Sequence, residues 1–356
     1  MTGGAARRSS PDQHDGAAGH PTGPEQHPAP GPGAGLSGRT TPRVSVVLPV
    51  FNGEAFLAAA LASVLGQTLE DLELIVVDDG STDATPAIVQ EFAADKRLVH
   101  HVQERQGIVG ALNAGLALAT APWIARMDAD DVMRPERLSR QLAFLESHPE
   151  LSGAASDYEL IDEEGRPWGA VHSPLVTVEA VEAYVRRGLP VVFAHPTMIV
   201  SAQAVAELGG YRAEYRDSED VDLFTRLLDS GRRLVVQPEV LLSLRVHGSS
   251  VSAGAGRRQL MLNDLIVLNS RRRRARLPEI TVAEHAASHR GTPRAALDFE
   301  RRLVRARLLR RATVHRRAGR RLAHLATVLL ALGVGPGRAV SAIVRRARSE
   351  AVRRRR

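Results

Sequence analysis

Short apolar runs alternate with Ala/Leu-rich stretches over the first half of the chain. Val44–Val50 is a valine-rich, mostly apolar run, which is typical of a strand buried on both faces of a parallel sheet. Residues 53–67 place apolar side chains at helical spacing. The same reasoning predicts a strand, a polar turn and a helix over 72–94, a strand over 97–104, a helix over 107–119 and a strand over 122–131.

Strands that alternate with helices of this length predict βαβ units with right-handed crossovers. The first half is therefore expected to form an α/β nucleotide-binding sandwich. In open sheets of this kind, ligands bind at the carboxyl ends of the strands. Three polar clusters, around Asn52, Asp79 and Asp128, follow predicted strands. The pattern thus places candidate chemistry at the ligand-binding edge of the sheet.

The second half of the chain is less regular. Residues 189–201 predict a strand, and residues 218–231 predict a helix that ends at a glycine. Residues 232–252 predict one or two strands and then a polar loop. The least patterned part runs from Asp157 to Phe193, where we expect the loops that bind an acceptor. Beyond about residue 255 the pattern is helical and rich in arginine.

Composition separates the two ends from the middle. Sixteen of the first 42 residues are Gly or Pro, so this segment cannot bury enough apolar surface to offset its ordering entropy, and we expect it to be disordered. It also lacks the apolar stretch of a secretory signal. The chain of 356 residues contains no cysteine, so disulfides and thiolate metal sites are excluded. A metal would require oxygen or imidazole ligands.

The net charge of +7 conceals a division along the chain. Residues 257–356 hold 27 Arg and 6 acidic residues, a net of +21, so the preceding residues carry −14. An acidic body followed by a basic tail indicates two different roles. We expect three segments: a Gly/Pro-rich tail over 1–42, a catalytic domain over 43–255 and a basic helical extension over 256–356.

Asp78 and Asp79 end the second predicted strand. One interpretation is a helix cap, because Ser81, Thr82 or Asp83 can cap the helix that follows. Capping does not account for two carboxylates before Gly80. A carboxylate at a strand end can instead accept hydrogen bonds from a ribose hydroxyl or a base N–H, as a nucleotide pocket requires.

Asp128, Asp130 and Asp131 lie at the end of the strand predicted over 122–131. Side chains separated by one residue in a strand point to the same side, so Asp128 and Asp130 can form an oxygen site for Mg²⁺ or Mn²⁺. The alternative is an acidic turn before a helix that Pro135 opens at its first position. From these residues alone the two interpretations are equally supported.

Glu219 and Asp220 begin the helix predicted over 218–231. Acidic residues in a first helical turn oppose the helix macrodipole, and Asp217 or Ser218 can cap the helix. That explains one or two of the acidic positions there but not all of them. A carboxylate facing the ligand crevice could deprotonate a sugar hydroxyl. His195 and His247 taken singly are typical of packing or hydrogen-bonding residues at strand ends.

Six stretches of the sequence occur in the order found in family 2 glycosyltransferases, which the chain resembles from Arg43 to Ser252. They are VSVVLPVFNGEAFLAAALASVLGQT, LELIVVDDGSTDAT, GIVGALNAGLALA, IARMDADDVMRPERLSRQLAFLE, HPTMIVS and EDVDLFTRLLDSG. The resemblance implies the GT-A nucleotide-diphospho-sugar transferase fold, with a Rossmann-like mixed sheet flanked by helices. Many members of that family build bacterial cell-surface polysaccharides.

The resemblance also implies an activity and roles for residues. The expected reaction is inverting transfer of a sugar from a nucleotide-diphosphate donor to a hydroxyl acceptor, either lipid-linked or polysaccharide, with Mn²⁺ or Mg²⁺ as cofactor. Asp220 matches the general base, with Glu219 beside it. The metal ligands are expected to be Asp130 and Asp128, and His247 lies near the metal. Donor contacts are implied for Pro49, Phe51, Asn52 and Glu54 in the first loop, Asp79 on the base and ribose side, Asp128 near the ribose and diphosphate, and Arg126 at the diphosphate.

The sequence departs from the processive members of that family. The Q-x-x-R-W motif of cellulose-, chitin- and hyaluronan-type synthases is absent, and so is a series of transmembrane helices. We therefore expect transfer of a single sugar. A sugar nucleotidyltransferase would open with a Gly-rich, basic phosphate loop, which PVFNGEAFL does not provide. The remaining alternative is a non-catalytic GT-A-like module recruited to membranes or polyanions by its basic tail.

The basic extension contains one long apolar stretch, Leu322 to Val344. His324, Gly333, Arg338 and the GPG at 335–337 interrupt it, whereas a spanning helix needs about 20 predominantly apolar residues. We expect an interfacial helix pair or a helix packed on the catalytic domain, with arginines that favour anionic lipid at the cytoplasmic face. The equal alternative is a helical appendage of an arginine-rich proteome. Nucleic-acid binding is not expected, because Phe299 is the tail's one aromatic residue.

Overall fold

The structure is a computed structural model that describes residues 41–247 and 256–290, with residues 301, 304, 308, 327 and 328. The predictions for residues 1–40, and for nearly all of the apolar stretch 322–344, fall outside the described residues.

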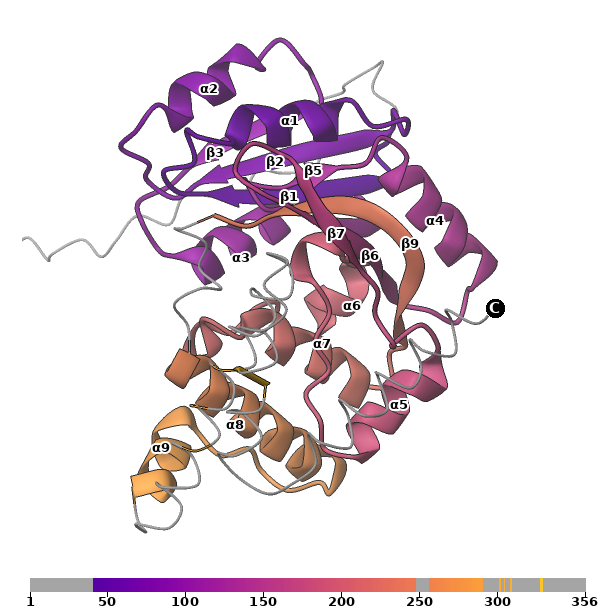
Figure 1. Ribbon diagram of the computed structural model, residues 1–356, viewed down its shortest axis with the longest axis vertical. Coiled ribbons are helices and arrows are strands. Elements are labelled where there is room, and N and C mark those ends of the chain that lie inside the picture. The colour runs from indigo at the N-terminus through magenta and orange to yellow at the C-terminus, as the bar shows by residue number, and fades with distance from the viewer. Residues whose placement is uncertain are drawn as a thin grey trace, which may run out of the picture. The chain divides into compact units, whose positions relative to one another are not determined.

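The first half of the chain forms the parallel part of a mixed sheet, as the apolar pattern predicts. The strands lie in the order β3-β2-β1-β4, and β1 pairs in parallel with both β2 and β4. A helix follows each of the first three strands (Figure 1). The elements are β1 Val44–Val50, α1 Leu57–Leu65, β2 Leu72–Asp78, α2 Thr85–Glu91, β3 Leu98–Val102, α3 Ile108–Leu118 and β4 Trp123–Arg126.

The second half extends the same sheet and makes it mixed. From β4 the order continues β8-β6-β9-β5, with antiparallel pairs except between β6 and β9, and β7 pairs with β6. Within the region 232–252, predicted to form one or two strands and a polar loop, residues Leu234–Arg245 form one long strand, β9, and residues 248–252 lie outside the described residues. The elements are β5 Val132–Met133, α4 Arg137–Ser147, β6 Gly153–Ile161, β7 Pro167–Val171, α5 Val178–Arg186, β8 Ile199–Ser201, α6 Ala202–Glu207, α7 Glu219–Asp229 and β9 Leu234–Arg245.

Three local predictions are wrong. The strand predicted over 189–201 is confined to β8, because His195–Thr197 forms a 3-10 turn around Pro196, which has no N–H to donate to a sheet. Helix α4 begins two residues after Pro135. The segment from Asp157 to Phe193, expected to consist of loops, contains most of the β6–β7 hairpin and α5, and its role in acceptor binding stays a prediction.

The core fills both faces of the sheet. Val44, Val46, Leu48 and Val50 of β1 share one buried cluster with apolar residues of α1 and α4. Val47, which points the other way along the same strand, belongs to a second cluster with residues of α3, α5, α6 and α7. This three-layer arrangement explains why β1 is a continuous apolar run, and it leaves the strand ends free to carry polar loops.

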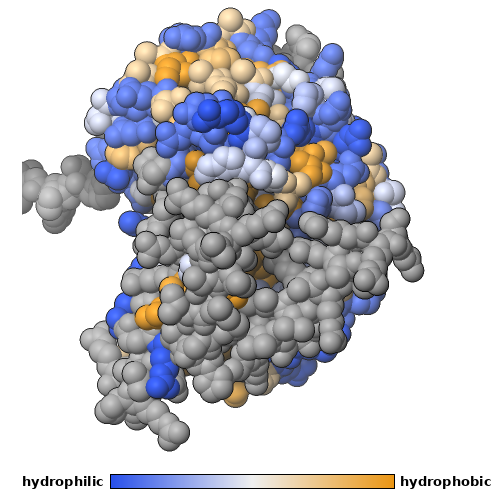
Figure 2. Space-filling view, viewed as in Figure 1, coloured by the Kyte–Doolittle hydropathy of each residue, from blue (hydrophilic) through white to orange (hydrophobic). Residues whose placement is uncertain are grey.

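Two further helices, α8 Gly256–Arg274 and α9 Val282–Arg290, follow the sheet. Leu262, Leu265 and Ile266 of α8 are buried against Tyr215 and Val221, which precede and begin α7. No helix among the described residues is long and apolar enough to cross a membrane. In the view of Figure 2, the described surface carries its hydrophobic residues in small groups between hydrophilic ones.

Candidate active site

Hydrogen bonds join the loop that follows β1 to the loop that follows β2. The backbone N–H of Asn52 donates to Ser81 Oγ at 2.9 Å, and Asn52 Oδ1 accepts from the N–H of Thr82 at 2.8 Å. Glu54 Oε2 accepts from the N–H of Ala84 at 3.0 Å. Asn52 has a φ of 52°, a conformation that asparagine tolerates better than most residues. Asn52 and Glu54 thus shape the rim of the first loop.

Pro49 and Phe51 occupy different places in this region. Pro49 lies within β1 and is buried opposite Val77, so it supports the loop from inside the sheet. The Phe51 side chain is 36% exposed, and the guanidinium carbon of Arg105 lies 3.7 Å from its ring centroid. This stacked pair provides a flat surface beside the strand ends, suited to a planar ligand group.

Asp79 is buried and accepts three hydrogen bonds from the segment after β3. Its Oδ1 accepts from Gln103 Nε2 and from the N–H of Gln106, and its Oδ2 accepts from the N–H of Gly107, each at 2.7 Å. The carboxylate therefore fixes the start of α3. Its neighbour Asp78 uses Oδ1 for the N–H of Ser81, while Oδ2 is buried without a partner among the described residues.

The three aspartates after β4 form a compact oxygen cluster. Asp128, Asp130 and Asp131 each offer a carboxylate oxygen, and these atoms lie within 4.8 Å of one another. Asp131 is 2% exposed, and its Oδ1 accepts from the backbone N–H of Arg245 at 2.8 Å. Asp130 Oδ2 lies 2.8 Å from His247 Nε2. The end of β9 therefore lies against the aspartate turn.

The electrostatics of this cluster suit a divalent cation. Burial, together with repulsion from Asp128 and Asp130, raises the pKa of Asp131 well above its ordinary value. Asp131 Oδ2 is buried without a partner in the described part of the chain. Clustered carboxylate oxygens with an adjacent imidazole are a ligand set that Mg²⁺ or Mn²⁺ can use. The residues present therefore fit such a metal.

Two buried arginines lie near the aspartates. Arg126 is 6% exposed and forms an ion pair with Asp128, while its Nε and Nη1 have no partner within the described residues. Arg137 is fully buried in α4 and donates to the carbonyl oxygens of Arg126 and Met198. Burial lowers the pKa of Arg137 to about 9, so it stays protonated at neutral pH. Arg126 retains the donor capacity that an anionic ligand requires.

Helix α7 presents two acidic residues at its N-terminus. Asp220 Oδ1 accepts from the N–H of Val221, and Glu219 Oε2 accepts from the N–H of Asp217, both at 2.8 Å. Burial, reinforced by the neighbouring charge of Glu219, raises the pKa of Asp220 to about 7. A carboxyl with this pKa can take up a proton near neutral pH.

A buried histidine and tyrosine accompany these groups. His195 Nε2 lies 2.8 Å from the Tyr211 hydroxyl. Burial and the charge of Arg126 hold the pKa of His195 well below its ordinary value, so the ring is neutral. The contact with Tyr211 agrees with the prediction that His195 is a packing or hydrogen-bonding residue. Tyr211 was not predicted, because nothing in the local pattern signals the pairing. Interactions of Tyr211 with the charges of Arg126 and Asp220 place it in the same electrostatic environment.

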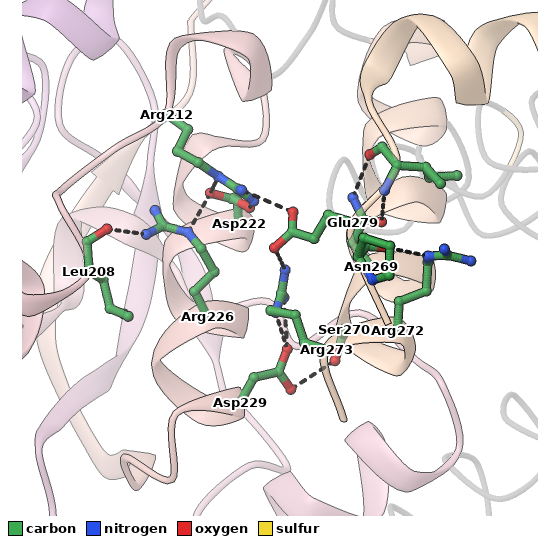
Figure 3. Close-up of polar contacts among 12 residues, drawn as sticks. Leu208, Arg212, Asp222, Arg226, Asp229, Asn269, Ser270, Arg272, Arg273 and Glu279 are labelled. Carbon is green, nitrogen blue, oxygen red and sulfur yellow. Dashed lines mark hydrogen bonds and ion pairs between the residues drawn. The ribbon is translucent and has the colours of Figure 1, made fainter. Parts of the chain in front are cut away.

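An ion-pair network holds α7 in position (Figure 3). Asp222 is fully buried and pairs with Arg212 and with Arg226, which lies one turn along α7. Arg212 also contacts Glu279 at 3.0 Å, and Glu279 contacts Arg273 of α8. The helix that carries Asp220 is therefore connected to the segment that contains α8 and α9.

Comparison with known proteins identifies the family. The model for glycosyl transferase family 2 matches residues 45–204. The putative glycosyltransferase EpsE of Bacillus subtilis is 35% identical over 209 residues, which cover 57% of this chain and 73% of that protein. This chain belongs to glycosyl transferase family 2. A second family relative, the amylovoran biosynthesis glycosyltransferase AmsE of Erwinia amylovora, is 32% identical over 60% of this chain and 79% of its own length.

Solved structures agree on the fold. Residues 1–349 of TarS from S. aureus, in complex with UDP, align with a TM-score of 0.51 at 19% identity, covering 80% of this chain and 89% of that one. The mannosyltransferase PcManGT from Pyrobaculum calidifontis, in complex with GDP-Man and Mn²⁺, aligns with a TM-score of 0.50 at 20% identity, covering 83% and 87%. The prediction of a GT-A fold is confirmed, and this family 2 chain is a glycosyltransferase.

The predicted residues fall into three places. The aspartate turn brings Arg126, Asp128, Asp130 and His247 together. The first loops hold the predicted nucleotide-contacting residues, and α7 holds the predicted base and its neighbour. The catalytic, donor-binding and metal-binding roles of these residues stay predictions. Pattern reasoning missed the contributions of Arg137, Tyr211 and Arg245.

Proposed function

We propose that this glycosyltransferase is a metal-dependent inverting enzyme that transfers one sugar from a nucleotide-diphosphate donor to a hydroxyl acceptor. The observation that supports this most is the aspartate cluster beside Arg126, which combines cation ligands with unused guanidinium donors. The relative AmsE, a glycosyltransferase of amylovoran biosynthesis, supports sugar transfer in polysaccharide synthesis, and the GDP-Man and Mn²⁺ bound to PcManGT favour a nucleotide-sugar donor and a metal.

The donor would bind along the edge formed by the strand ends. We propose that Pro49, Phe51, Asn52, Glu54 and Asp79 shape the nucleotide site. The diphosphate would lie at Arg126 and Asp128, where a buried guanidinium supplies charge-assisted hydrogen bonds. A divalent cation held by Asp130, Asp128 and His247 supplies charge neutralisation for the leaving diphosphate when bound.

Asp220 is proposed as the general base. It removes the proton of the acceptor hydroxyl, whose oxygen then forms the new bond to the anomeric carbon. The bond from that carbon to the diphosphate oxygen breaks, and the nucleoside diphosphate leaves with the electron pair. Attack from the face opposite the leaving group inverts the anomeric configuration. Burial, reinforced by the charge of Glu219, keeps the pKa of Asp220 high enough for proton uptake near neutral pH.

The acceptor is proposed to be a lipid-linked or polysaccharide hydroxyl in cell-surface polysaccharide or glycolipid synthesis. Such acceptors suit an enzyme at the inner face of the plasma membrane, which an arginine-rich extension would favour. Binding to vesicles with and without anionic lipid tests this localisation, and equal binding to both contradicts the electrostatic part of the proposal.

Donor turnover tests the proposed function. The full chain is incubated with UDP-, GDP- and dTDP-sugars, with Mn²⁺ or with a chelator, and donor hydrolysis is followed by mass spectrometry. We expect one donor class to be hydrolysed only when the metal is present. If no donor in this panel is bound or turned over in a metal-dependent way, the proposal fails.

A further inference from the structure

We propose that Arg245 is a positioning residue that assembles the metal site and couples it to the turn between β6 and β7. This inference rests on the proposed function, because it concerns the metal that the aspartates are proposed to hold. Arg245 is the last residue of β9 and is 7% exposed.

The guanidinium of Arg245 joins two turns that are distant in sequence. Its Nε donates to the carbonyl oxygen of Asp130 at 2.9 Å. Its Nη1 donates to the carbonyl oxygens of Asp162 and Glu163, at 2.9 and 2.7 Å. One side chain therefore fixes the backbone of the aspartate turn against the backbone of the β6–β7 turn.

The main chain of β9 reinforces this arrangement. The N–H of Arg245 donates to Asp131 Oδ1, and two residues later His247 contacts Asp130 Oδ2. In the register between the parallel strands, Arg245 lies opposite Ile161, the last residue of β6. The short segment from Arg245 to His247 thus contacts two of the three clustered aspartates.

An aromatic ring supports the arginine from a third direction. The guanidinium carbon of Arg245 lies 4.6 Å from the centroid of Phe56, and the same ring lies 5.0 Å from the His247 ring. Phe56 directly precedes α1. Packing against the Phe56 ring restricts the rotamers of Arg245 and His247. The two side chains beside the aspartate cluster are therefore held in defined positions.

The planar fork of arginine is required for these contacts. Nε and Nη1 point in fixed, different directions, whereas a lysine ammonium is a single point donor on a flexible stem. Arg245→Lys keeps the positive charge and the backbone N–H that binds Asp131, but it cannot span both turns. The substitution therefore separates positioning from net charge.

Metal binding is the readout that distinguishes positioning from simple stabilisation. Mn²⁺ binding to the full chain is titrated by electron paramagnetic resonance, alone and with UDP or GDP. We expect Arg245→Lys to bind Mn²⁺ about 10-fold to 100-fold more weakly, as is typical when a residue that orients metal ligands is changed. Arg166→Lys is the matched control. Arg166 lies in the same β6–β7 turn, but the described hydrogen bonds of its guanidinium reach only the carboxylates of Asp162 and Glu164.

Hydrogen exchange of the wild type provides a second measurement that needs no substitution. If Arg245 couples the two turns, Mn²⁺ should slow amide exchange at residues 162–166, although none of these residues belongs to the aspartate cluster. This result decides the matter if Arg245→Lys does not fold.

The outcomes separate the inference from the proposed function. Wild-type protein that binds no Mn²⁺ under any of these conditions overturns the proposed metal dependence and the inference with it. Wild-type protein that binds Mn²⁺, together with an Arg245→Lys variant of equal affinity, overturns the inference alone. If Mn²⁺ binds but amide hydrogen exchange at residues 162–166 does not change, the proposed coupling between the metal site and the β6–β7 turn is also overturned.

Discussion

At the scale of single residues, the raised pKa of Asp220 determines the pH at which it can act as a base. Burial raises the pKa of Asp220 to about 7, with the charge of Glu219 as the second cause. A general base acts only when deprotonated, so below this pKa the rate falls with the fraction of carboxylate. We expect metal-dependent donor hydrolysis to rise with pH and to level off above about pH 7.

Glu219→Gln removes the neighbouring negative charge and should lower the pKa of Asp220. The rise in kcat then moves to lower pH, because the carboxylate form persists in more acidic solution. The measurement is kcat at saturating donor across the pH range. Glu182→Gln, at an exposed carboxylate of α5, is the control and should keep the wild-type profile. An unshifted Glu219→Gln profile contradicts the assignment of Asp220 as the base.

Asp130 and Asp220 should fail in different ways when substituted. Asp130→Ala removes a proposed metal ligand, so we expect metal-dependent donor affinity and turnover to be lost together. Asp220→Asn keeps the shape of the site but cannot accept the proton, so turnover should fall about 10²-fold to 10⁴-fold while donor affinity is nearly unchanged. Calorimetric donor binding with Mn²⁺ measures the first effect, and kcat measures the second. Wild-type affinity and turnover in Asp130→Ala would rule out its metal role.

The residues that could be predicted are those that follow strands or open a helix. Asp128, Asp130 and Asp220 stand at such positions, and the topology of a parallel sheet brings strand ends together. The involvement of Arg245 and Tyr211 could not be predicted. Their partners are backbone carbonyls or residues far along the chain, and a sequence pattern does not report such contacts.

At the scale of elements, α7 depends on buried charge pairs along one of its faces. Asp222 is fully buried between Arg212 and Arg226 (Figure 3). Asp222→Asn would leave two guanidinium groups without their shared carboxylate, and breaking a buried pair in this way typically costs about 3–5 kcal/mol. We expect a loss of this size in the free energy of unfolding, measured by urea denaturation.

Glu279→Gln is the comparison within the same network. Glu279 and its partner Arg212 are partly exposed, so water screens their interaction and the expected loss is about 1 kcal/mol or less. Similar losses for the two variants would show that burial does not control the strength of this network. A loss confined to Asp222→Asn would support its role in holding the helix that carries Asp220.

Among the elements that the sequence predicts correctly are strands with mostly apolar runs. Strands β1 and β2 are buried along their whole length, and their composition reports this. Strand β6 was missed because it buries polar residues. Asp157 accepts hydrogen bonds from His172 and from the N–H of Ser173, so its burial is offset by partners that hydropathy does not register.

At the scale of the whole molecule, α8 packs against α7 and the residues just before it. Leu265 is fully buried against the cluster that includes Tyr215 and Val221. If α8 unfolds together with the sheet, Leu265→Ala should lower the free energy of unfolding by about 2–5 kcal/mol and shift one cooperative transition. Circular dichroism and intrinsic fluorescence should then report the same midpoint.

Two separate transitions, of which only one responds to Leu265→Ala, would instead support the boundary predicted at residue 255. Leu277→Ala serves as the control, because this side chain is 51% exposed and its truncation should change stability little. The composition of the chain alone could not show whether α8 folds together with the sheet or separately from it. The change to an arginine-rich sequence marks a change in charge, whereas the buried leucines of α8 determine where the helix packs.

Strand β7 also bears on how copies of this protein behave in concentrated solution. Among the described residues, β7 pairs only with β6, so its outer side is a potential template for a strand from another molecule. Pro167 has no N–H, Gly169 has a φ of 123°, and the register with β6 shifts between Leu160 and Ile161. These irregularities interrupt the even row of donors and acceptors that intermolecular strand addition requires. We therefore expect the β6–β7 hairpin, whose turn Arg245 holds against the aspartate cluster, to resist aggregation through its open edge.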